Sequence, residues 1–564
     1  MRWSHTPPPQ QAVKRLQTQL GLSPVLAELL AHRVSEPEEA RVFLDPRLRR
    51  LSDPFALTQL EAVVKRLCLA LENGEEICIV GDYDVDGITS TALLVSALQA
   101  FGGKPVYYLP RRMEEGYGLS SGMLDRILAG APPDLLIALD CGTNSADEVK
   151  RLRTLGIDVI VVDHHESKDA VATDCLLINP KLYAADAPLR DLCTAGLVFK
   201  LIHGLVKDLR QQGDKRAHEL QLKGWLDLVA LGTVADLVPL RGENRIFVRE
   251  GLRQVSQTKR PGLKALCEIS GLERGQQLST ADLSYKLGPR LNAGGRLADA
   301  AMPLELLLSQ AAKACHETAV QLDALNRERQ GIERRIFEEA LHAVDRPSPD
   351  AVVVAGEDWH AGVVGIVAGR LARQFYRPAI VLCRDGDLYR GSGRSIAEVN
   401  LQEVLHDCDG YLAEWGGHRM AVGVSVEAGR LSAFQAAFTE RVGQCFTEAI
   451  PEPTLDLAAK IKPEDLGESL LNDIDRLRPF GMDNPEPVFW VEGVVLPRAP
   501  EVFAQKHIKF DLLGERGRKI SAIGWSFSEK PPPAGQPLDL AVRFGWNTWN
   551  GRRSPRLELV DWSG

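Results

Sequence analysis

A short apolar run followed by clustered acids reads Ile77-Cys78-Ile79-Val80-Gly81-Asp82-Tyr83-Asp84-Val85-Asp86-Gly87. The first four residues have the composition of a short buried strand, and three carboxylates follow closely. So many negative charges at the end of a buried strand would repel one another strongly unless cations neutralised them. The stretch therefore predicts a strand whose carboxyl end holds divalent metal.

The same pattern of a strand and then an acid returns twice along the chain. Residues 135–139 precede Asp140, and residues 159–162 precede Asp163-His164-His165. In a parallel sheet, ligands gather at the carboxyl ends of strands, so side chains far apart in sequence can share one crevice. An isolated Asp in such a place is more often a helix N-cap or a turn residue. Recurrence after three strands favours a shared site.

A calcium-binding loop is an alternative interpretation of residues 82–87. That loop requires a Glu near its twelfth position, whereas this chain continues as Ile88-Thr89-Ser90-Thr91-Ala92-Leu93-Leu94, the apolar start of a helix. The calcium loop is therefore disfavoured.

Length and composition set the class of protein. The chain has 564 residues, of which 45% are hydrophobic and 25% charged, so we expect a globular protein with three or four domains. No uninterrupted apolar run approaches the roughly 20 residues that cross a bilayer, and the first residues lack the apolar core of a secretion signal. The ten cysteines include no Cys-x-x-Cys pair. We expect a cytoplasmic protein with reduced cysteines and no membrane partner.

Changes in hydrophobic pattern and breaks at Gly and Pro residues predict an α/β protein with five regions. Apolar strands alternate with helical patterns from about 55 to 245, short helices continue to a break at Gly294-Gly295, and helical spacing covers 303–345. The predicted regions are a helical leader (1–50), a domain with a doubly wound parallel sheet (51–300), a connecting helix (301–345), a second, smaller α/β domain (346–450) and a C-terminal OB-like β-barrel (451–564).

The charge of the chain varies along its length. The formal net charge of −9 argues mildly against a nucleic-acid partner, but the sign varies along the chain: residues 452–497 hold ten acids against four basic residues, whereas 498–564 hold eleven basic residues against seven acids. That last stretch interleaves aromatic residues such as Phe503 and Trp525 with basic ones such as Lys506 and Lys509. Two interpretations are equally open: a surface on which unpaired bases stack, or a barrel with an aromatic core and a solvated basic face.

The triplet Asp163-His164-His165 gives the DHH phosphoesterases their name, and within that superfamily the chain resembles the RecJ family of exonucleases specific for single-stranded DNA. Further matches are Gly-Thr-Val-Ala-Asp-Leu-Val-Pro-Leu at 232–240, Gly-Pro-Arg-Leu-Asn-Ala-Gly-Gly-Arg at 288–296 and Gly-Gly-His at 416–418. The resemblance spans nearly the whole chain. Gly294 stands where the family pattern has Ala, a small departure.

The resemblance implies a site for two divalent ions, with one carboxylate bridging them. The implied ligands are Asp84, Asp86, Asp140, His164 and Asp236. Asp82 is a candidate replacement for a His that other branches carry at the position of Val80. An oxygen-rich set with one imidazole favours Mn²⁺ or Mg²⁺ over zinc. Asp163 and His165 are implied to orient His164 and a metal-bound water by hydrogen bonds.

The resemblance also implies removal of 5′-mononucleotides from the 5′ end of single strands in recombination and repair. A terminal phosphate must then be recognised, and the candidate contacts are Arg111, Arg112, Ser392 and Arg394. Without the resemblance, Gly391–Ser395 would be interpreted as a plain turn.

Three further groups of residues are implied to contact the strand. His418 of Gly416-Gly417-His418 would stabilise charge on the scissile phosphate, although the motif alone predicts the start of a strand with an exposed His. Arg290 and Arg296 flank a predicted turn at Asn292–Gly295, where contacts to DNA backbone and a purely structural ion-pair role stay open. His360 would help to build a phosphate pocket at a helix N-terminus.

The implied partners are single-stranded DNA, a single-stranded-DNA-binding protein and a recombination helicase, with the enzyme acting as a monomer. A groove too narrow for duplex would explain the preference for single strands. One rival function is a catalytically inactive scaffold that binds single-stranded DNA, which the intact acids disfavour. The other is a DHH phosphoesterase acting on short oligonucleotides, cyclic dinucleotides or pyrophosphate, which the additional C-terminal domain disfavours.

Overall fold

The computed structural model of the chain divides into two compact units. The larger unit comprises Trp3–Pro289, Ala300–His316 and Leu455–Gly564, and the smaller unit comprises Met1–Arg2, Arg290–Asp299 and Glu317–Thr454. The structure describes residues 2–111, 115–116, 118–167, 171–184, 187, 189–344, 350–446, 451–549 and 552–564. No helix in these ranges combines the length and the apolar character of a membrane span.

The larger unit contains a five-stranded parallel sheet with the strand order β3-β2-β4-β5-β6. Its strands are β2 (Ile77–Val80), β3 (Val106–Tyr108), β4 (Leu135–Leu139), β5 (Asp158–Val162) and β6 (Leu176–Ile178). The chain runs outward from β2 to β3 and then returns to the other side of β2 to form β4. A doubly wound sheet binds its ligands at this switch point, beyond the carboxyl ends of the two strands.

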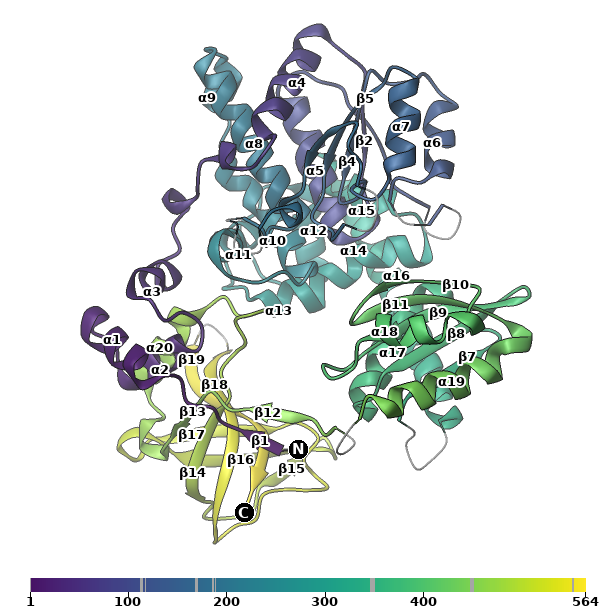
Figure 1. The fold of residues 1–564 in the computed structure, drawn as a ribbon. Coiled ribbons are helices and arrows are strands. Elements are labelled where there is room, and N and C mark those ends of the chain that lie inside the picture. Colours follow the sequence, from purple (N-terminus) through teal and green to yellow (C-terminus); the bar gives the residue numbers. More distant parts are fainter. Residues whose placement is uncertain are drawn as a thin grey trace. The chain divides into compact units, whose positions relative to one another are not determined.

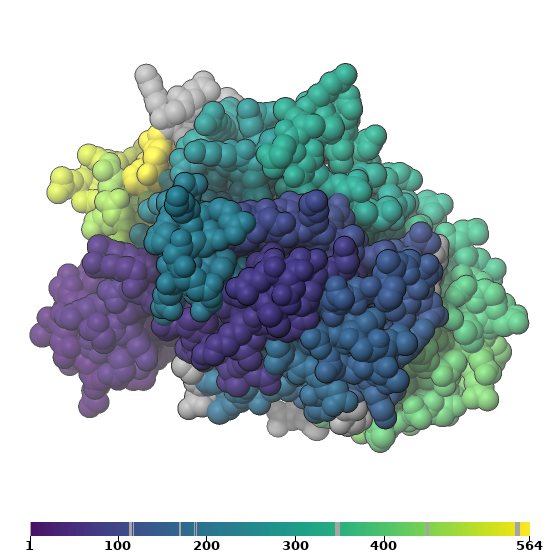
Figure 2. Space-filling view, turned by 90° about the horizontal axis from the view of Figure 1, so that it is seen from above, coloured from purple at the N-terminus to yellow at the C-terminus, as the bar shows by residue number. Residues whose placement is uncertain are grey.

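Helices cover both faces of this sheet (Figure 1). Helices α6 (Ser121–Leu128) and α7 (Ala146–Thr154) pack on one face, where Met123 and Leu152 meet Val80 and Val161 in one buried cluster. Helices α4 (Leu60–Asn73), α5 (Val85–Ala100) and α8 (Thr194–Gln211) lie on the other face. Helices α4 and α8 pack side by side, and the surface seen in Figure 2 includes this region in indigo and blue-teal.

Among the described residues between β6 and residue 344 the chain forms helices and no strand, whereas the sequence predicted strands as far as residue 245. In runs such as Leu226–Val234, which is helical, every residue is buried. The sequence pattern of such a short apolar run does not distinguish a buried helix from a buried strand. These helices are α9 (Lys215–Glu219), α10 (Leu226–Ala235), α11 (Gly242–Ser256), α12 (Pro261–Ile269), α13 (Thr280–Asp282), a π-helix (Leu283–Leu287), α14 (Gly288–Leu297), α15 (Ala301–Leu308) and α16 (Ala312–Ala343).

Two sequence predictions in this region are wrong. The predicted break and turn at Asn292–Gly295 lie inside α14, because the full burial of Leu291 and Ala293 outweighs the cost of about 1 kcal/mol per helical glycine. The predicted single connecting helix is divided into α15 and α16. Its division falls at Ser309, whose backbone is extended and whose hydroxyl accepts a hydrogen bond from the Ala311 amide.

The smaller unit contains a mixed sheet with the strand order β10-β11-β9-β8-β7. The C-terminal part of α16 packs against this sheet and α17 through Ile336 and Ala340. The strands are β7 (Val352–Gly356), β8 (Ala379–Asp385), β9 (Leu388–Arg394), β10 (Glu414–His418) and β11 (Ala421–Glu427). The helices are α17 (Ala361–Phe375), α18 (Leu401–Asp407) and α19 (Leu431–Gln444).

The C-terminal part of the larger unit is a seven-stranded barrel-like sheet with the order β13-β14-β18-β19-β17-β16-β15. Its elements are β13 (Ala459–Ile461), α20 (Glu468–Leu477), β14 (Phe489–Val495), β15 (Glu501–Phe503), β16 (His507–Leu513), β17 (Lys519–Gly524), β18 (Pro537–Trp549) and β19 (Arg552–Ser563). The N-terminal leader packs on it, with Leu26 and Phe43 in the same buried cluster as Phe489. The leader consists of β1 (Arg2–Ser4), paired with β12 (Thr454–Asp456), and of α1 (Gln10–Leu20), α2 (Pro24–Ala31) and α3 (Pro37–Leu44).

Candidate metal centre

The first group of acids is built at the junction between β2 and α5. Asp84 caps the helix, since its Oδ1 accepts hydrogen bonds from the amides of Asp86 at 2.9 Å and Gly87 at 3.1 Å. A Cβ at Gly87 would lie 2.5 Å from the backbone oxygen of Asp82, so only glycine permits this tight turn. The turn therefore brings all three carboxylates to the end of the strand.

The start of α8 holds two of the acids in place. The amides of Thr194 and Ala195 donate to the two carboxylate oxygens of Asp86 at 2.7 and 2.9 Å. The Thr194 hydroxyl donates to Oδ1 of Asp140 at 2.8 Å. Since a helix N-terminus carries partial positive charge, it also partly offsets the charge of the two buried carboxylates.

His164 lies at the centre of the cluster. Its Nε2 is 3.4 Å from Oδ1 of Asp140, 3.4 Å from Oδ2 of Asp236 and 3.8 Å from Oδ2 of Asp86. Within the described residues, Nε2 of His164, Oδ2 of Asp236 and both carboxylate oxygens of Asp82 are buried without a hydrogen-bond partner. Buried polar atoms of this kind need a partner, and a hard cation supplies one for carboxylates and imidazole together.

The ligand atoms fall into overlapping groups of three. Three such groups occur among the described residues, and within each the ligand atoms lie within 4.8 Å of one another. The groups are Asp82–Asp84–Asp140, Asp86–His164–Asp236 and Asp140–His164–His165. Asp140 and His164 each belong to two groups, an arrangement with room for two ions that share a ligand.

The carboxylates are held in an environment that opposes their ionisation. Burial and the Asp140 carboxylate raise the pKa of Asp84 to about 7, and burial raises the pKa of Asp236 to about 6. Burial and neighbouring carboxylates raise the pKa values of Asp82 and Asp86 well above the ordinary range. Divalent cations would remove this penalty, so the electrostatics fit a metal site.

Asp163 and His165 support the cluster from behind. Oδ1 of Asp163 accepts hydrogen bonds from the amide of His164 at 2.8 Å and lies 2.7 Å from Nδ1 of His165. Oδ2 of Asp163 accepts from the Thr143 amide at 3.1 Å. Although burial opposes it, the bonded Asp163 carboxylate raises the pKa of His165 to about 9. These contacts fit the predicted orienting role of Asp163, while His165 also reaches the ligand cluster.

Comparison with known families gives three matches along the chain. The DHH family N-terminal domain covers residues 76–233, the DHHA1 domain covers 349–444 and the RecJ OB domain covers 457–561. The single-stranded-DNA-specific exonuclease RecJ of Bacillus subtilis is 35% identical over 100% of this chain and 70% of its own length. The protein with the same name from Escherichia coli is 35% identical over 96% of each chain.

The chain belongs to the RecJ family. Solved RecJ structures agree with this assignment. A crystal structure of RecJ in complex with Mn²⁺ from Thermus thermophilus aligns with a TM-score of 0.85 and 28% identity, over 100% of this chain and 79% of the other. The corresponding Mg²⁺ complex aligns with a TM-score of 0.79 and 27% identity, over 100% of this chain and 78% of the other.

The predicted phosphate contacts in this RecJ-family chain are divided between the two units, and Arg111 belongs to the larger one. Arg111 follows β3, so it stands at the same edge of the sheet as the acids, and it is exposed. Its amide donates to a carboxylate oxygen of Glu115 at 2.9 Å. Arg112 lies outside the described residues.

The remaining predicted phosphate contacts are in the smaller unit. Ser392 and Arg394 lie on β9, which pairs with β8 and β11, so the interpretation of this stretch as a plain turn is wrong. A Cβ at Gly391 would lie 1.9 Å from the Val381 oxygen, and close packing between strands explains this glycine. Gly416, Gly417 and His418 end the edge strand β10, and His418 is exposed, as the motif alone predicted.

Arg290, Arg296 and His360 make structural contacts within the smaller unit. Nε of Arg290 donates to Oδ1 of Asp323 at 2.9 Å, and Nη1 of Arg296 donates to the Gly362 oxygen at 2.8 Å. His360 caps α17, because its Nδ1 accepts from the Gly362 amide at 3.0 Å. The His therefore stands at a helix N-terminus, where the sequence placed it.

Sequence reasoning missed Thr194 and the buried polar pair Thr143 and Asn179. Nδ2 of Asn179 donates to the Thr143 hydroxyl at 2.8 Å and to the His165 oxygen at 2.9 Å. A Thr before an apolar helical run signals a helix start, which could have marked Thr194. No local pattern indicates that this helix start meets Asp86 and Asp140.

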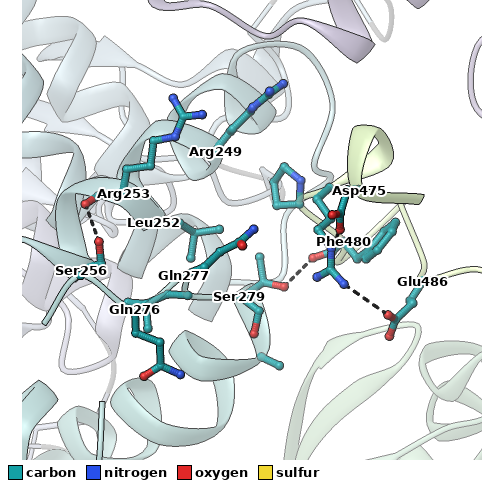
Figure 3. A pocket seen from close by; sticks show the side chains of 16 residues that line it. Arg249, Leu252, Arg253, Ser256, Gln276, Gln277, Ser279, Asp475, Phe480 and Glu486 are labelled. Atoms are coloured by element: carbon teal, nitrogen blue, oxygen red, sulfur yellow. Dashed lines mark hydrogen bonds and ion pairs between the residues drawn. The ribbon is translucent and has the colours of Figure 1, made fainter. Parts of the chain in front are cut away.

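A groove elsewhere in the larger unit is separate from the acids (Figure 3). It has a volume of about 660 Å³ and lies between α11, the segment before α13 and the turn after α20. Arg249, Arg253 and Arg478 contribute cations to it, and Glu486 is 3.9 Å from Arg478. None of the predicted site residues lines this groove, which therefore does not compete with the acid cluster as the catalytic site.

Proposed function

We propose that this protein is a metal-dependent exonuclease that degrades single-stranded DNA from its 5′ end and releases 5′-mononucleotides. The observation that carries the proposal is the convergence of Asp84, Asp140, His164 and Asp236, from four distant segments, in one buried cluster. Membership of the RecJ family indicates single-stranded DNA as the substrate, since the curated relatives are named single-stranded-DNA-specific exonucleases.

Two Mn²⁺ or Mg²⁺ ions bound here would activate water, hold the scissile phosphate and stabilise the departing oxygen. The residues for one ion are Asp82, Asp84 and Asp140, and those for the other are Asp86, His164 and Asp236, with Asp140 placed between the two sets. Oδ1 of Asp163 accepts a hydrogen bond from the His164 amide and lies beside the His165 ring. These contacts would keep His164 in its orientation. Thr194 holds one acid of each set, Asp140 through its hydroxyl and Asp86 through its amide.

The direction of digestion requires contacts that recognise a terminal 5′ phosphate. We assign these contacts to Arg111, Arg112, Ser392 and Arg394. We assign stabilisation of the charge on the scissile phosphate to His418, together with Gly416 and Gly417. Arg290, Arg296 and His360 would complete the strand-binding surface. Supporting features are the place of Arg111 at the edge that carries the acids and the exposure of His418.

The setting of the reaction follows from the same assignment. We propose that the protein acts in the cytoplasm as a monomer in recombination and repair, and that it works with a single-stranded-DNA-binding protein and a recombination helicase. The two rival functions, an inactive scaffold and a phosphoesterase for small nucleotides, are disfavoured by the intact acid cluster and by full-length similarity to the exonucleases.

Digestion of end-labelled single strands tests the proposal. With Mn²⁺, a 5′ label should be released as mononucleotide at once, whereas a 3′ label should stay on progressively shorter strands. Asp140→Ala should abolish release, and Asp125→Ala, an exposed acid on α6, should act as wild type. Early release of the 3′ label would overturn the direction, and full activity of Asp140→Ala would overturn the site.

A further inference from the structure

The groove of Figure 3 has the size and the walls of a site for a small molecule. Its volume of about 660 Å³ lies within the range of about 300–1,000 Å³ that is usual for ligand pockets. One wall is a single face of α11, since Arg249, Leu252, Arg253 and Ser256 are spaced by three and four residues. The opposite wall lies within residues 475–486. Both walls belong to the larger unit, so the groove is a feature of one compact body.

Two guanidinium groups stand together on the α11 wall (Figure 3). Burial and then the charge of Arg253 lower the pKa of Arg249, and the carboxylates of Asp45 and Glu250 offset only part of this effect. Nη1 of Arg249 donates to the Leu44 oxygen at 3.2 Å, and a neutral oxygen does not cancel its charge. Arg253 is 3.5 Å from Glu250, but its side chain is 64% exposed, and such exposed pairs contribute little. An anion placed against both arginines would relieve their repulsion.

The wall that faces α11 carries charges of both signs. Nε of Arg478 donates to Oδ1 of Asp475 at 3.0 Å, and Nη2 of Arg478 lies 3.9 Å from Oε1 of Glu486. A nucleic-acid strand crossing the groove would bring its phosphates close to these two carboxylates. A compact ligand can instead keep its phosphates at the α11 wall and place a hydrogen-bond donor near Glu486. The pattern of charge therefore favours a small anion over a continuous strand.

Apolar side chains and amides complete the lining of the groove. Leu252, Leu278 and Phe480 are almost buried, and their remaining exposed parts line the cavity. Gln276 and Gln277 are exposed and bring amide groups to the same cavity. Apolar surface with a few hydrogen-bonding groups is the usual lining around a ring system such as a nucleobase. Inorganic phosphate would use the arginines but not this apolar surface.

We propose that the groove binds a nucleoside phosphate at a site separate from the metal centre. The phosphates would lie against Arg249 and Arg253, because a guanidinium group can donate to two phosphate oxygens. The base would contact Leu252 and Leu278, and Glu486 would accept a hydrogen bond from a sugar hydroxyl or a base amino group. Such a ligand would contact both walls at once and stabilise the junction between α11 and the turn after α20. The inference goes beyond the proposed function, since no bond is hydrolysed in the groove.

Calorimetric titration of the full chain with ATP in EDTA tests the groove, because EDTA keeps divalent ions out of the metal centre. We expect saturable binding and a higher unfolding temperature in the presence of ATP. Arg249→Gln and Arg253→Gln should each weaken ATP binding by about tenfold or more, since each removes hydrogen bonds to a charged phosphate. The exposed side chain of Arg253 makes the second variant the safer one for folding. The matched control is Arg516→Gln, which removes an exposed arginine of the barrel and should bind ATP as wild type does.

Three comparison ligands identify which part of ATP the groove recognises. Adenosine, which lacks phosphate, and tripolyphosphate, which lacks the nucleoside, should each bind about tenfold or more weakly than ATP. A thymidine strand of about 30 nucleotides should not displace ATP. Displacement by this strand, or equally tight binding of adenosine or tripolyphosphate, would overturn the assignment to a nucleoside phosphate.

The variants decide whether the groove itself is the site. Absence of saturable ATP binding would overturn the proposal outright. Wild-type affinity of both Arg249→Gln and Arg253→Gln, or an equal loss in Arg516→Gln, would place any ATP binding elsewhere and overturn the groove. Failure of the enzyme to digest single strands would contradict the proposed function alone, because the ATP titration requires no hydrolysis.

Discussion

The hydroxyl of Thr194 donates a hydrogen bond to Oδ1 of Asp140 at 2.8 Å, while the amide of the same residue donates to Oδ2 of Asp86 at 2.7 Å. One fully buried residue thus holds two acids that come from the ends of different strands. Its contacts set the spacing between Asp140, which belongs to one proposed ion position, and Asp86, which belongs to the other.

Thr194→Val keeps the shape of this side chain and removes only its donor. The Asp140 carboxylate would lose a partner and gain freedom, so we expect Mn²⁺ affinity to fall by about 10- to 100-fold. Titration calorimetry of the metal-free protein measures this effect independently of activity. Thr194→Ser retains the hydroxyl and should bind Mn²⁺ nearly as wild type does. Equal affinity of the Val and Ser variants would show that the hydroxyl has no positioning role.

Gly232 has no space for a side chain. A Cβ there would lie 2.7 Å from Oδ1 of Asp86 and 2.6 Å from the Thr89 hydroxyl. Gly232→Ala should therefore displace Asp86, lower stability by about 1–3 kcal/mol and weaken metal binding. Thermal unfolding with and without Mn²⁺ measures both effects. Gly224→Ala is the matched control, since no atom lies within 4 Å of its Cβ position. Similar unfolding of the two variants would contradict the steric argument.

Rising pH should lower the stability of the metal-free protein. With pKa values raised to about 7 for Asp84 and about 6 for Asp236, the folded chain keeps protons that the unfolded chain releases near pH 4. The stability that these protons contribute is complete below about pH 4 and is lost as the pH rises through about 6 to 7. The Asp140 and Asp236 carboxylates raise the pKa of His164 to about 10 despite its burial, which extends the same trend to higher pH.

Divalent metal should reverse this trend, because it binds ionised carboxylates and neutral imidazole. The rise in unfolding temperature caused by Mn²⁺ should therefore grow between about pH 5 and pH 8. Thermal melts in EDTA and in Mn²⁺ across this range measure it. Asp84→Asn removes one titrating group and should flatten the EDTA curve. A Mn²⁺ effect that shrinks as the pH rises would contradict the prediction.

The sequence predicted those parts of the site that are local. Residues 77–87 contain a strand, a turn and three acids in one run, so their arrangement follows from adjacent residues. Asp140 and His164 could also be predicted from the sequence, because each follows its own apolar strand. Parallel pairing of β2, β4 and β5 then brings these acids together, as the general rule for such sheets requires.

Other features depend on contacts between distant residues. The leader packs on the barrel, where the Ser23 hydroxyl donates to Oδ2 of Asp473 at 2.5 Å, and no pattern in either segment indicates the other. The helix through Asn292–Gly295 was missed for a related reason. The free-energy cost of placing glycines in a helix is smaller than the stabilisation gained by burying Leu291 and Ala293. The role of Thr194 likewise exists only because α8 begins beside the acids.

Arg245 shows how the leader, α11 and the barrel are joined. Its guanidinium is buried and donates to four backbone oxygens, those of Phe43, Leu477, Arg478 and Pro479. These four described hydrogen-bond partners include no carboxylate, and burial lowers the pKa of the guanidinium to about 9. The carbonyls thus take the place of a counter-ion, and two of them, those of Arg478 and Pro479, belong to the turn that also lines the groove of Figure 3.

Arg245→Met should leave these four oxygens without donors and cost roughly 3 kcal/mol or more. The methionine can fill part of the space and contact the Phe43 ring, which lies 3.7 Å from the guanidinium carbon, but it supplies no hydrogen bond. We expect earlier thermal unfolding and faster proteolysis after α3, with Mn²⁺ affinity unchanged because the acids lie elsewhere. Arg253→Met, an exposed arginine on the same helix, should change neither property. Equal protease resistance of the two variants would mean that apolar packing of Leu26 and Phe43 suffices to hold the leader on the barrel.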